Sequence, residues 1–182
     1  MKMDVPLAPL GPLPIGDLLA VLPAAEDPIW DQFAMRRNMK MHAATRTIAL
    51  IWGDMLPGIA EPVIFEPEGL PTALRAAAME CAAQLVQRVG GGAVSRLMLV
   101  DLPAGAEVLP HRDIAPIITD PHRCHVPVVT NDRVSFVIDG TDHHLEAGQA
   151  YQVDNTRQHS VANHGEIWRV HLICDVMAQR AA

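Results

Sequence analysis

The chain has 182 residues, enough for one domain with a substantial buried core, and we expect residues 1–182 to form a single domain. Its composition is that of a globular protein, and no apolar run approaches the roughly 18 residues of a membrane span, so we expect no membrane association. The net charge is −7 and no basic cluster stands out, which argues against nucleic acid as a partner.

The N-terminus and the cysteines indicate where the protein works. Four prolines interrupt the first 14 residues, so this stretch lacks the unbroken apolar region of a signal peptide. Cys81, Cys124 and Cys174 are odd in number and widely spaced, which fits neither a zinc motif nor a disulfide framework. We expect buried free thiols and a cytoplasmic protein.

Residues 1–92 are expected to form an N-terminal arm, helices and one supporting strand. The proline-rich residues 1–26 predict a covering arm with a short helix around residues 15–22. An acid followed by proline at Asp27-Pro28 is a favourable helix start, and this helix is expected to run toward Met35.

A strand and a long helix follow in the same half of the chain. Residues 45–52 are β-branched and apolar and predict the supporting strand. Residues 71–89 predict a helix, because their apolar side chains recur at helical spacing and three glycines follow them. The apolar stripe of this helix is expected to pack on a sheet.

From Ser95 onward the sequence changes to short β-type runs separated by turn residues. The eight runs are residues 96–102, 107–113, 123–130, 134–139, 143–146, 149–154, 159–163 and 166–176. No helical pattern lies among them, so a mainly β sandwich or barrel is predicted for residues 93–178, with the preceding helices flanking it.

A candidate metal site comes from residues in two of these runs. His111 and Asp113 are two positions apart, so in a strand both side chains would point to one face. This motif alone is more often a solvated histidine and aspartate. His159, far along the chain, would complete two imidazoles and one carboxylate, the ligand set of non-haem Fe(II) oxygenases.

Candidate anion-binding residues occupy two further strands. Arg169 and His171 share one face of the apolar last strand, where an unpaired guanidinium would be costly to bury. Its partner is either a structural carboxylate or a bound dicarboxylate co-substrate. Arg123 and His125 repeat the two-residue spacing and could bind the other carboxylate of such a co-substrate.

Residues 95–176 resemble the aspartyl/asparaginyl β-hydroxylase family of 2-oxoglutarate-dependent oxygenases. The matching segments, in their order and spacing, are residues 110–113, 123–127, 137–140, 154–156, 159–163 and 168–172. The resemblance implies a double-stranded β-helix, which is a jelly-roll or cupin-like barrel, with Fe(II) as cofactor at its mouth.

The same resemblance implies roles for the candidate residues. His111, Asp113 and His159 would bind the iron, and Arg169 would anchor the distal carboxylate of 2-oxoglutarate. Arg123 and His125 would lie near the metal-binding end of that co-substrate. The implied reaction is hydroxylation of an unactivated C–H bond with O₂ and 2-oxoglutarate as co-substrates.

The substrate is open at this stage. The carboxylate of Asp113 makes the chain more similar to the branch that hydroxylates free amino acids, so a small molecule such as an amino acid or its derivative is expected. A peptidyl Asp/Asn or acyl-chain β-hydroxylase is the alternative within this chemistry. A cupin-type protein that binds metal without oxidation is the alternative outside it.

Two weaker candidates lie in the first half of the chain. Arg36 and Arg37 are expected at a helix end, where cations favour the dipole, or they could hold a substrate carboxylate. His42 could reach the mouth of the barrel.

Overall fold

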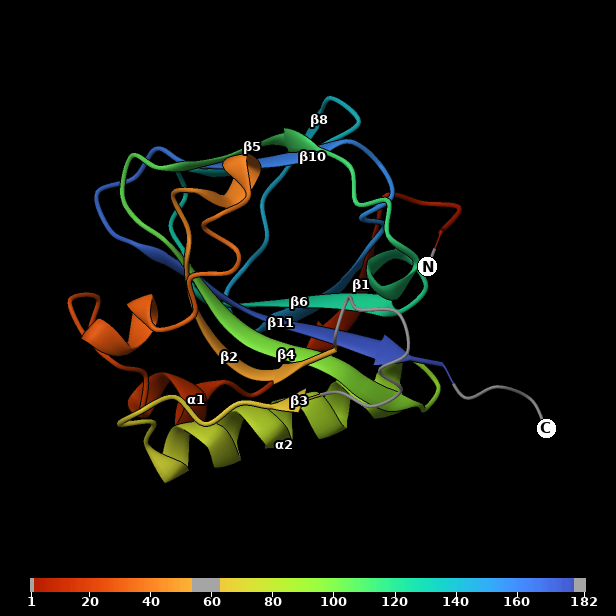
Figure 1. Cartoon of the computed structure of the whole chain (residues 1–182). Helices are drawn as coiled ribbons and strands as arrows, with labels where there is room; N and C mark the ends of the chain where they lie inside the picture. Colours follow the sequence, from red (N-terminus) through yellow and green to blue (C-terminus); the bar gives the residue numbers. More distant parts are fainter. Residues whose placement is uncertain (1, 54–62, 179–182) are drawn as a thin grey trace.

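Two antiparallel β-sheets lie face to face, and helices cover the outer face of the larger one (Figure 1). The structure is a computed structural model that describes residues 2–53 and 63–178. Within these ranges no helix is both long enough and apolar enough to cross a bilayer.

The larger sheet has seven strands in the order β1-β9-β6-β11-β4-β2-β3. These strands are β1 (Leu7–Pro12), β9 (Gln149–Val153), β6 (His122–Val129), β11 (Arg169–Met177), β4 (Ala93–Leu102), β2 (Arg46–Trp52) and β3 (Val63–Ile64). The smaller sheet has four strands in the order β5-β10-β7-β8. They are β5 (Glu107–His111), β10 (His159–Asn163), β7 (Val134–Ile138) and β8 (Thr141–His143).

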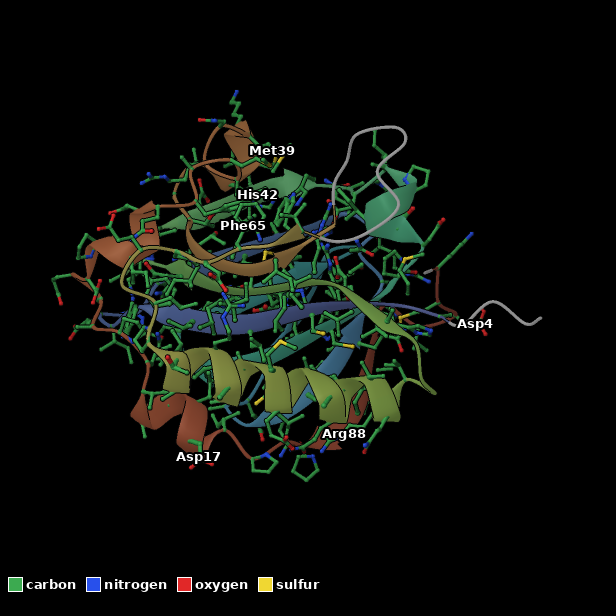
Figure 2. All side chains as sticks on the ribbon, turned by 60° about the horizontal axis from the view of Figure 1, so that its bottom comes forward. Asp4, Asp17, Met39, His42, Phe65 and Arg88 are labelled. Atoms are coloured by element: carbon green, nitrogen blue, oxygen red, sulfur yellow. The ribbon has the colours of Figure 1, made fainter. Side chains whose placement is uncertain are left out.

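The helices are few and mostly short. They are α1 (Gly16–Ala20), α2 (Thr72–Arg88) and α3 (Pro116–Thr119), with single 3-10 turns at η1 (Pro28–Asp31) and η2 (Lys40–His42). Arg88 at the end of α2 donates hydrogen bonds to three backbone carbonyls of β1, at Leu10, Gly11 and Pro12. Figure 2 shows Arg88 and His42 on opposite sides of the large sheet.

Alternation along β11 separates a helix-facing core from the interior between the sheets. Val170, Leu172 and Cys174 are buried in the core cluster that includes the apolar stripe of α2. Successive side chains of a strand point to opposite faces, so Arg169 and His171 point to the other side. There a second apolar cluster, with members from both sheets, closes the interior around the site.

The predicted fold class is confirmed: the protein is mainly β and has the cupin-like, double-stranded β-helix arrangement of two antiparallel sheets. All eight strands expected after Ser95 form, and so do the supporting strand, the short helix and the long helix. Residues of the first half also complete the larger sheet, since β1 pairs with β9 and β2 pairs with β4.

Several details differ from the sequence prediction. The N-terminal arm contains the strand β1, whose prolines are tolerated because it lies at a sheet edge. The two-residue strand β3 was not predicted, and the helix expected from Asp27 toward Met35 is a single 3-10 turn. The strand β5 ends at His111 rather than Asp113, and β8 begins two residues before its predicted start.

Candidate metal and co-substrate site

Two histidines from neighbouring strands meet at one end of the smaller sheet. His111 is the last residue of β5, and His159 is the first of β10. The two are direct partners across the antiparallel ladder, and their ring centroids lie 4.3 Å apart. Residues 48 apart in the sequence (159 − 111) are therefore adjacent because the two strands pair.

Hydrogen bonds fix the chemical form that both imidazoles present. Nδ1 of His111 lies 2.7 Å from the carbonyl oxygen of Leu109, and Nδ1 of His159 lies 2.9 Å from that of Arg157. A carbonyl can only accept, so each Nδ1 donates, and the tautomer that this selects has its lone pair on Nε2. A histidine that binds a metal through one ring nitrogen commonly donates its other N–H to a carbonyl in this way, so the pair fits a metal ion.

Asp113 lies beyond the end of β5, in a loop rather than on the strand face that the sequence predicted. Its backbone N–H donates to the carbonyl of Asn155. Its Oδ2 accepts hydrogen bonds from Arg123 and from the Asn155 amide, both at 2.8 Å. In the described part of the chain, no three His, Cys, Asp or Glu side chains are grouped to hold a metal. Asp113 as third ligand therefore stays a prediction.

Arg123 connects Asp113 to a second buried carboxylate. It donates to both oxygens of Asp175, at 2.8 and 2.7 Å, and to Asp113 through its third nitrogen. Burial alone would raise the pKa of Asp113, but the Arg123 charge and the Asn155 hydrogen bond together lower it. Asp113 is thus held ionised beside the histidine pair. Because Arg123 already donates to two protein carboxylates, its predicted contact with the co-substrate stays a prediction.

Arg169 supplies a buried positive charge with no carboxylate partner in residues 2–53 and 63–178. Its side chain is 2% exposed, its Nη2 donates to Nδ1 of His171 at 2.6 Å, and its Nε has no partner. Burial, followed by repulsion from Arg36, lowers its pKa to about 9, so it stays protonated at neutral pH. Such a group fits an anion that enters the site.

His171 and His125 lie behind this charge as neutral donors and acceptors. Burial, followed by the nearby arginines, places the pKa of both rings well below the usual value. Their Nδ1 atoms lie 3.4 Å apart, and Nε2 of His171 has no partner. Within the part of the chain that the structure describes, no carboxylate accepts a hydrogen bond from this series of polar groups, which runs from Arg169 through His171 to His125.

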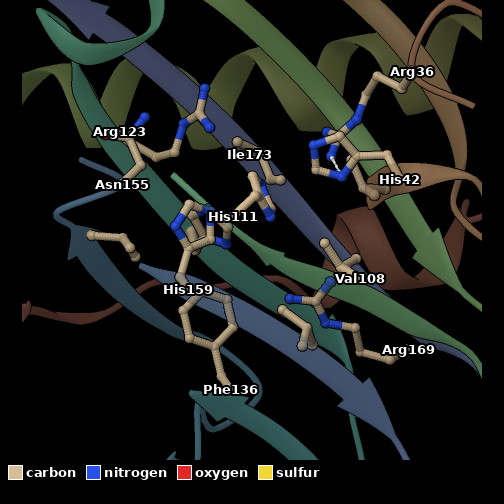
Figure 3. Close-up of a pocket in the computed structure, with 14 residues that line it drawn as sticks. Arg36, His42, Val108, His111, Arg123, Phe136, Asn155, His159, Arg169 and Ile173 are labelled. Atoms are coloured by element: carbon tan, nitrogen blue, oxygen red, sulfur yellow. Dashed lines mark hydrogen bonds between the residues drawn. The ribbon is translucent and has the colours of Figure 1, made fainter. Parts of the chain in front are cut away.

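Most of these side chains, but not Asp113, Asp175 or His171, line one pocket between the sheets, which we call the inner pocket. Its polar wall comprises His42, His111, His125, His159, Asn155 and the guanidinium groups of Arg36, Arg123 and Arg169. Figure 3 shows the His111–His159 pair at the centre, with Arg123 and Arg169 on opposite sides of it. The pocket thus combines two available imidazole nitrogens with an unmatched positive charge.

Sequence reasoning missed several residues of this region. Asn155 appeared only inside a matching segment, and Asp175 had no assigned role. Arg96 was missed altogether, although an arginine within the apolar strand β4 is the same signal that singled out Arg169. Arg36 and His42, which were weak candidates, do line the inner pocket.

A jelly-roll scaffold with a histidine pair and an unmatched arginine between its sheets is compatible with a non-haem iron oxygenase, in which two histidines and one carboxylate bind the metal. The family model for aspartyl/asparaginyl β-hydroxylases matches residues 63–179, more than half of the chain. The protein belongs to this family, and it is an oxygenase of the hydroxylase type that the family represents. Fe(II) and 2-oxoglutarate are the cofactor and co-substrate that the family implies.

Solved structures share the fold at low sequence identity. AviO1 from Streptomyces viridochromogenes Tue57 is 16% identical, with 97% of this chain and 91% of that chain covered and a TM-score of 0.55. A 2OG-Fe(II) oxygenase-family oxidoreductase from Burkholderia pseudomallei is 12% identical, with coverages of 76% and 68% and a TM-score of 0.54. No curated protein matches the chain.

Proposed function

We propose that this protein is an Fe(II)- and 2-oxoglutarate-dependent dioxygenase that hydroxylates an unactivated C–H bond of a small molecule, an amino acid or amino-acid derivative. The observation that carries the proposal is the inner pocket, where two imidazoles with available Nε2 atoms share a wall with the unmatched charge of Arg169. Metal chelation and carboxylate binding in one pocket are what a 2-oxo dicarboxylate requires.

Each residue has a defined task in this proposal. His111 and His159 would hold Fe(II) through Nε2, and Asp113 would supply the third ligand through Oδ1, because both hydrogen bonds it accepts fall on Oδ2. The bound iron would activate O₂ for oxidative decarboxylation of 2-oxoglutarate and transfer of one oxygen atom to the substrate. Arg169 would orient the distal carboxylate of 2-oxoglutarate by charge-assisted hydrogen bonds.

Arg123 and His125 would act at the metal-binding end of 2-oxoglutarate. Both line the inner pocket, because they lie two positions apart on β6 and share one face of the strand. Arg123 would also position Asp113, since its bidentate contact with Asp175 fixes the guanidinium that holds the Asp113 carboxylate. The apolar side chains around the pocket, including Val108, Phe136 and Val161, would exclude water during the reaction.

The test is release of succinate that depends on both Fe(II) and 2-oxoglutarate. Protein loaded with Fe(II) without oxygen is exposed to air with 2-oxoglutarate and a panel of carboxylic acids, amino acids and N-acylated amino acids. The proposal expects one equivalent of succinate per hydroxylated product, which gains one oxygen atom. The variant His159→Ala is expected to lose turnover by a factor of about 100 or more, because a ligand of the metal is removed.

A matched control is His164→Ala, a change at an exposed turn histidine that should keep full turnover. Circular dichroism of both variants checks that the sheets form. If metal binds but succinate never forms with any acid in the panel, the protein is a non-oxidative, cupin-type metal binder and the proposal fails.

A further inference from the structure

A second pocket adjoins the inner pocket and has its own buried charges. This outer pocket encloses about 220 Å³ and shares Arg36, His42, His111 and Arg123 with the inner one. An engineered cavity of about 150 Å³ is large enough for benzene, so a small organic molecule fits here. Because His111 lines both pockets, a molecule in the outer pocket would lie next to the candidate metal site.

Two arginines of the outer pocket are buried without adequate partners. Arg36 is 8% exposed; its Nη1 approaches only the weak acceptor Sδ of Met98, and its Nη2 donates to His42. Arg96 is 2% exposed, and its one ion pair, with Asp175, spans 3.9 Å. Within residues 2–53 and 63–178, Nε of Arg36 and both Nε and Nη2 of Arg96 have no hydrogen-bond partner. Buried guanidinium donors are costly to leave unpaired, so they indicate a missing acceptor.

The charges around this pocket do not balance. Arg36, Arg96 and Arg123 form one electrostatic cluster with two carboxylates, those of Asp113 and Asp175. Arg123 already engages both carboxylates by direct hydrogen bonds. Among the described residues of this cluster, three guanidinium groups face two carboxylates, so positive charge is in excess, which suits an anionic ligand. Among the lining residues that the structure describes, Asp113 is the only acid.

The rest of the wall is apolar and adaptable. Met39, Met41, Met98, Trp52, Ile114 and Ile118 line it, and methionines fill irregular spaces well. The Arg96 guanidinium lies over the Trp52 ring, 4.5 Å from its centroid, which fixes its plane at the edge of this surface. A ligand with one carboxylate and an apolar body would satisfy both the unpaired donors and the apolar wall.

We infer that the outer pocket is the substrate site, and that Arg36 and Arg96 bind the carboxylate of a monocarboxylic acid whose apolar body lies against the methionine-lined wall. This inference deepens the proposed function, on which it rests, by naming the chemical class of the substrate. With no acid free to pair an ammonium group among the described lining residues, an acyl or N-acylated acid suits the pocket better than a free amino acid.

The test compares two probes of one shape that differ in charge. Hexanoate and hexanamide are titrated calorimetrically into the metal-free protein without 2-oxoglutarate. Hexanoate is expected to bind about tenfold more tightly or better, because only the carboxylate brings a negative charge to the two arginines. Similar affinities of the two probes, or no binding of either at millimolar concentration, would overturn the inference without any variant.

Variants then locate the carboxylate. Arg36→Met and Arg96→Met keep the aliphatic stem and are each expected to weaken hexanoate binding about tenfold or more, with little effect on hexanamide. The matched control is Arg37→Met, because Arg37 is the next residue in the chain, is partly exposed and pairs with Asp31. Its hexanoate affinity should equal that of the unaltered protein.

The variant Arg169→Met distinguishes hexanoate bound in the outer pocket from hexanoate bound at the co-substrate site. It should leave hexanoate binding unchanged. If hexanoate binding is lost in Arg169→Met but kept in Arg96→Met, the probe occupies the co-substrate site and the inference is wrong. These measurements use no iron and no turnover. Selective hexanoate binding without succinate formation would therefore refute the proposed function and leave the carboxylate site standing. Succinate formation without selective hexanoate binding would refute only the carboxylate site.

Discussion

Asp113 is the residue whose role most affects the chemistry of the site. Arg123 and Asn155 hold its carboxylate through one oxygen, beside two histidines whose Nε2 atoms are available. Sequence spacing placed Asp113 on a strand face with His111, but β5 ends at His111. The partners that position the carboxylate come from β6 and from the segment before β10, and no local pattern around residue 113 encodes them.

The variant Asp113→Asn tests whether this carboxylate is a metal ligand. It keeps the shape of the side chain and removes its charge, so Mn(II) affinity measured by calorimetry is expected to fall about 10- to 100-fold. Arg112→Gln is the control, since Arg112 is the exposed neighbour of Asp113, and it should leave the affinity unchanged. An unaltered affinity in Asp113→Asn would mean that the two histidines bind the metal without it.

Arginines show how much of the site the sequence could reveal. Arg169 was found because a charged residue in an apolar strand needs a partner, and the structure indeed gives it no carboxylate in the described ranges. Arg96 is likewise a charged residue in an apolar strand, β4. It was overlooked because no candidate metal ligand lies near it in the sequence. Its significance depends on Arg123 occupying both nearby carboxylates, which is a property of the folded arrangement alone.

At the scale of elements, alternation of apolar and polar residues predicted the strands well. The run at β11 was recognised because one of its faces packs on α2 and the other bears Arg169 and His171. Strand ends were less predictable, because the end of β5 depends on a backbone hydrogen bond from Asp113 to Asn155 in a distant loop. The edge strand β1 escaped prediction because prolines recur every two or three residues from Pro6 to Pro14, which is typical of a loop.

The buried histidines of β6 and β11 make stability depend on pH. His125 and His171 have pKa values well below the usual value, chiefly because burial disfavours their charged forms. Below a pH of about 6.5 the unfolded chain binds protons that the folded protein excludes, so the free energy of unfolding falls as pH falls. Each of these histidines is expected to lower the free energy of unfolding by about 1.4 kcal/mol between pH 7.5 and 5.5.

Denaturant titrations of the metal-free protein at these two pH values measure this loss. His171→Gln should reduce the pH-dependent loss by the share of one histidine, even if it lowers stability at both pH values. His164→Gln, at an exposed turn, should not change the pH-dependent loss. Equal pH dependence in all three proteins would mean that His171 titrates freely in the folded state.

At the scale of the whole molecule, two of the three apolar clusters of the described residues divide the structural and chemical tasks. The cluster between the larger sheet and the helices α1 and α2 fixes that sheet from behind. The smaller cluster between the sheets contributes Val108, Phe136, Val153 and Val161 to the wall of the inner pocket, so the site lies in an apolar interior that strengthens its charge interactions. His42 of η2 lines both pockets and packs edge-on against His111.

The most direct test of the central claim is an anaerobic titration of 2-oxoglutarate into the Fe(II)-loaded protein, followed by visible absorption. A 2-oxo acid that chelates Fe(II) gives a charge-transfer band. We expect this band in the unaltered protein, its absence in His159→Ala, and a requirement for about tenfold more 2-oxoglutarate in Arg169→Ala. No band in the unaltered protein, or the same band in His159→Ala, would contradict the account.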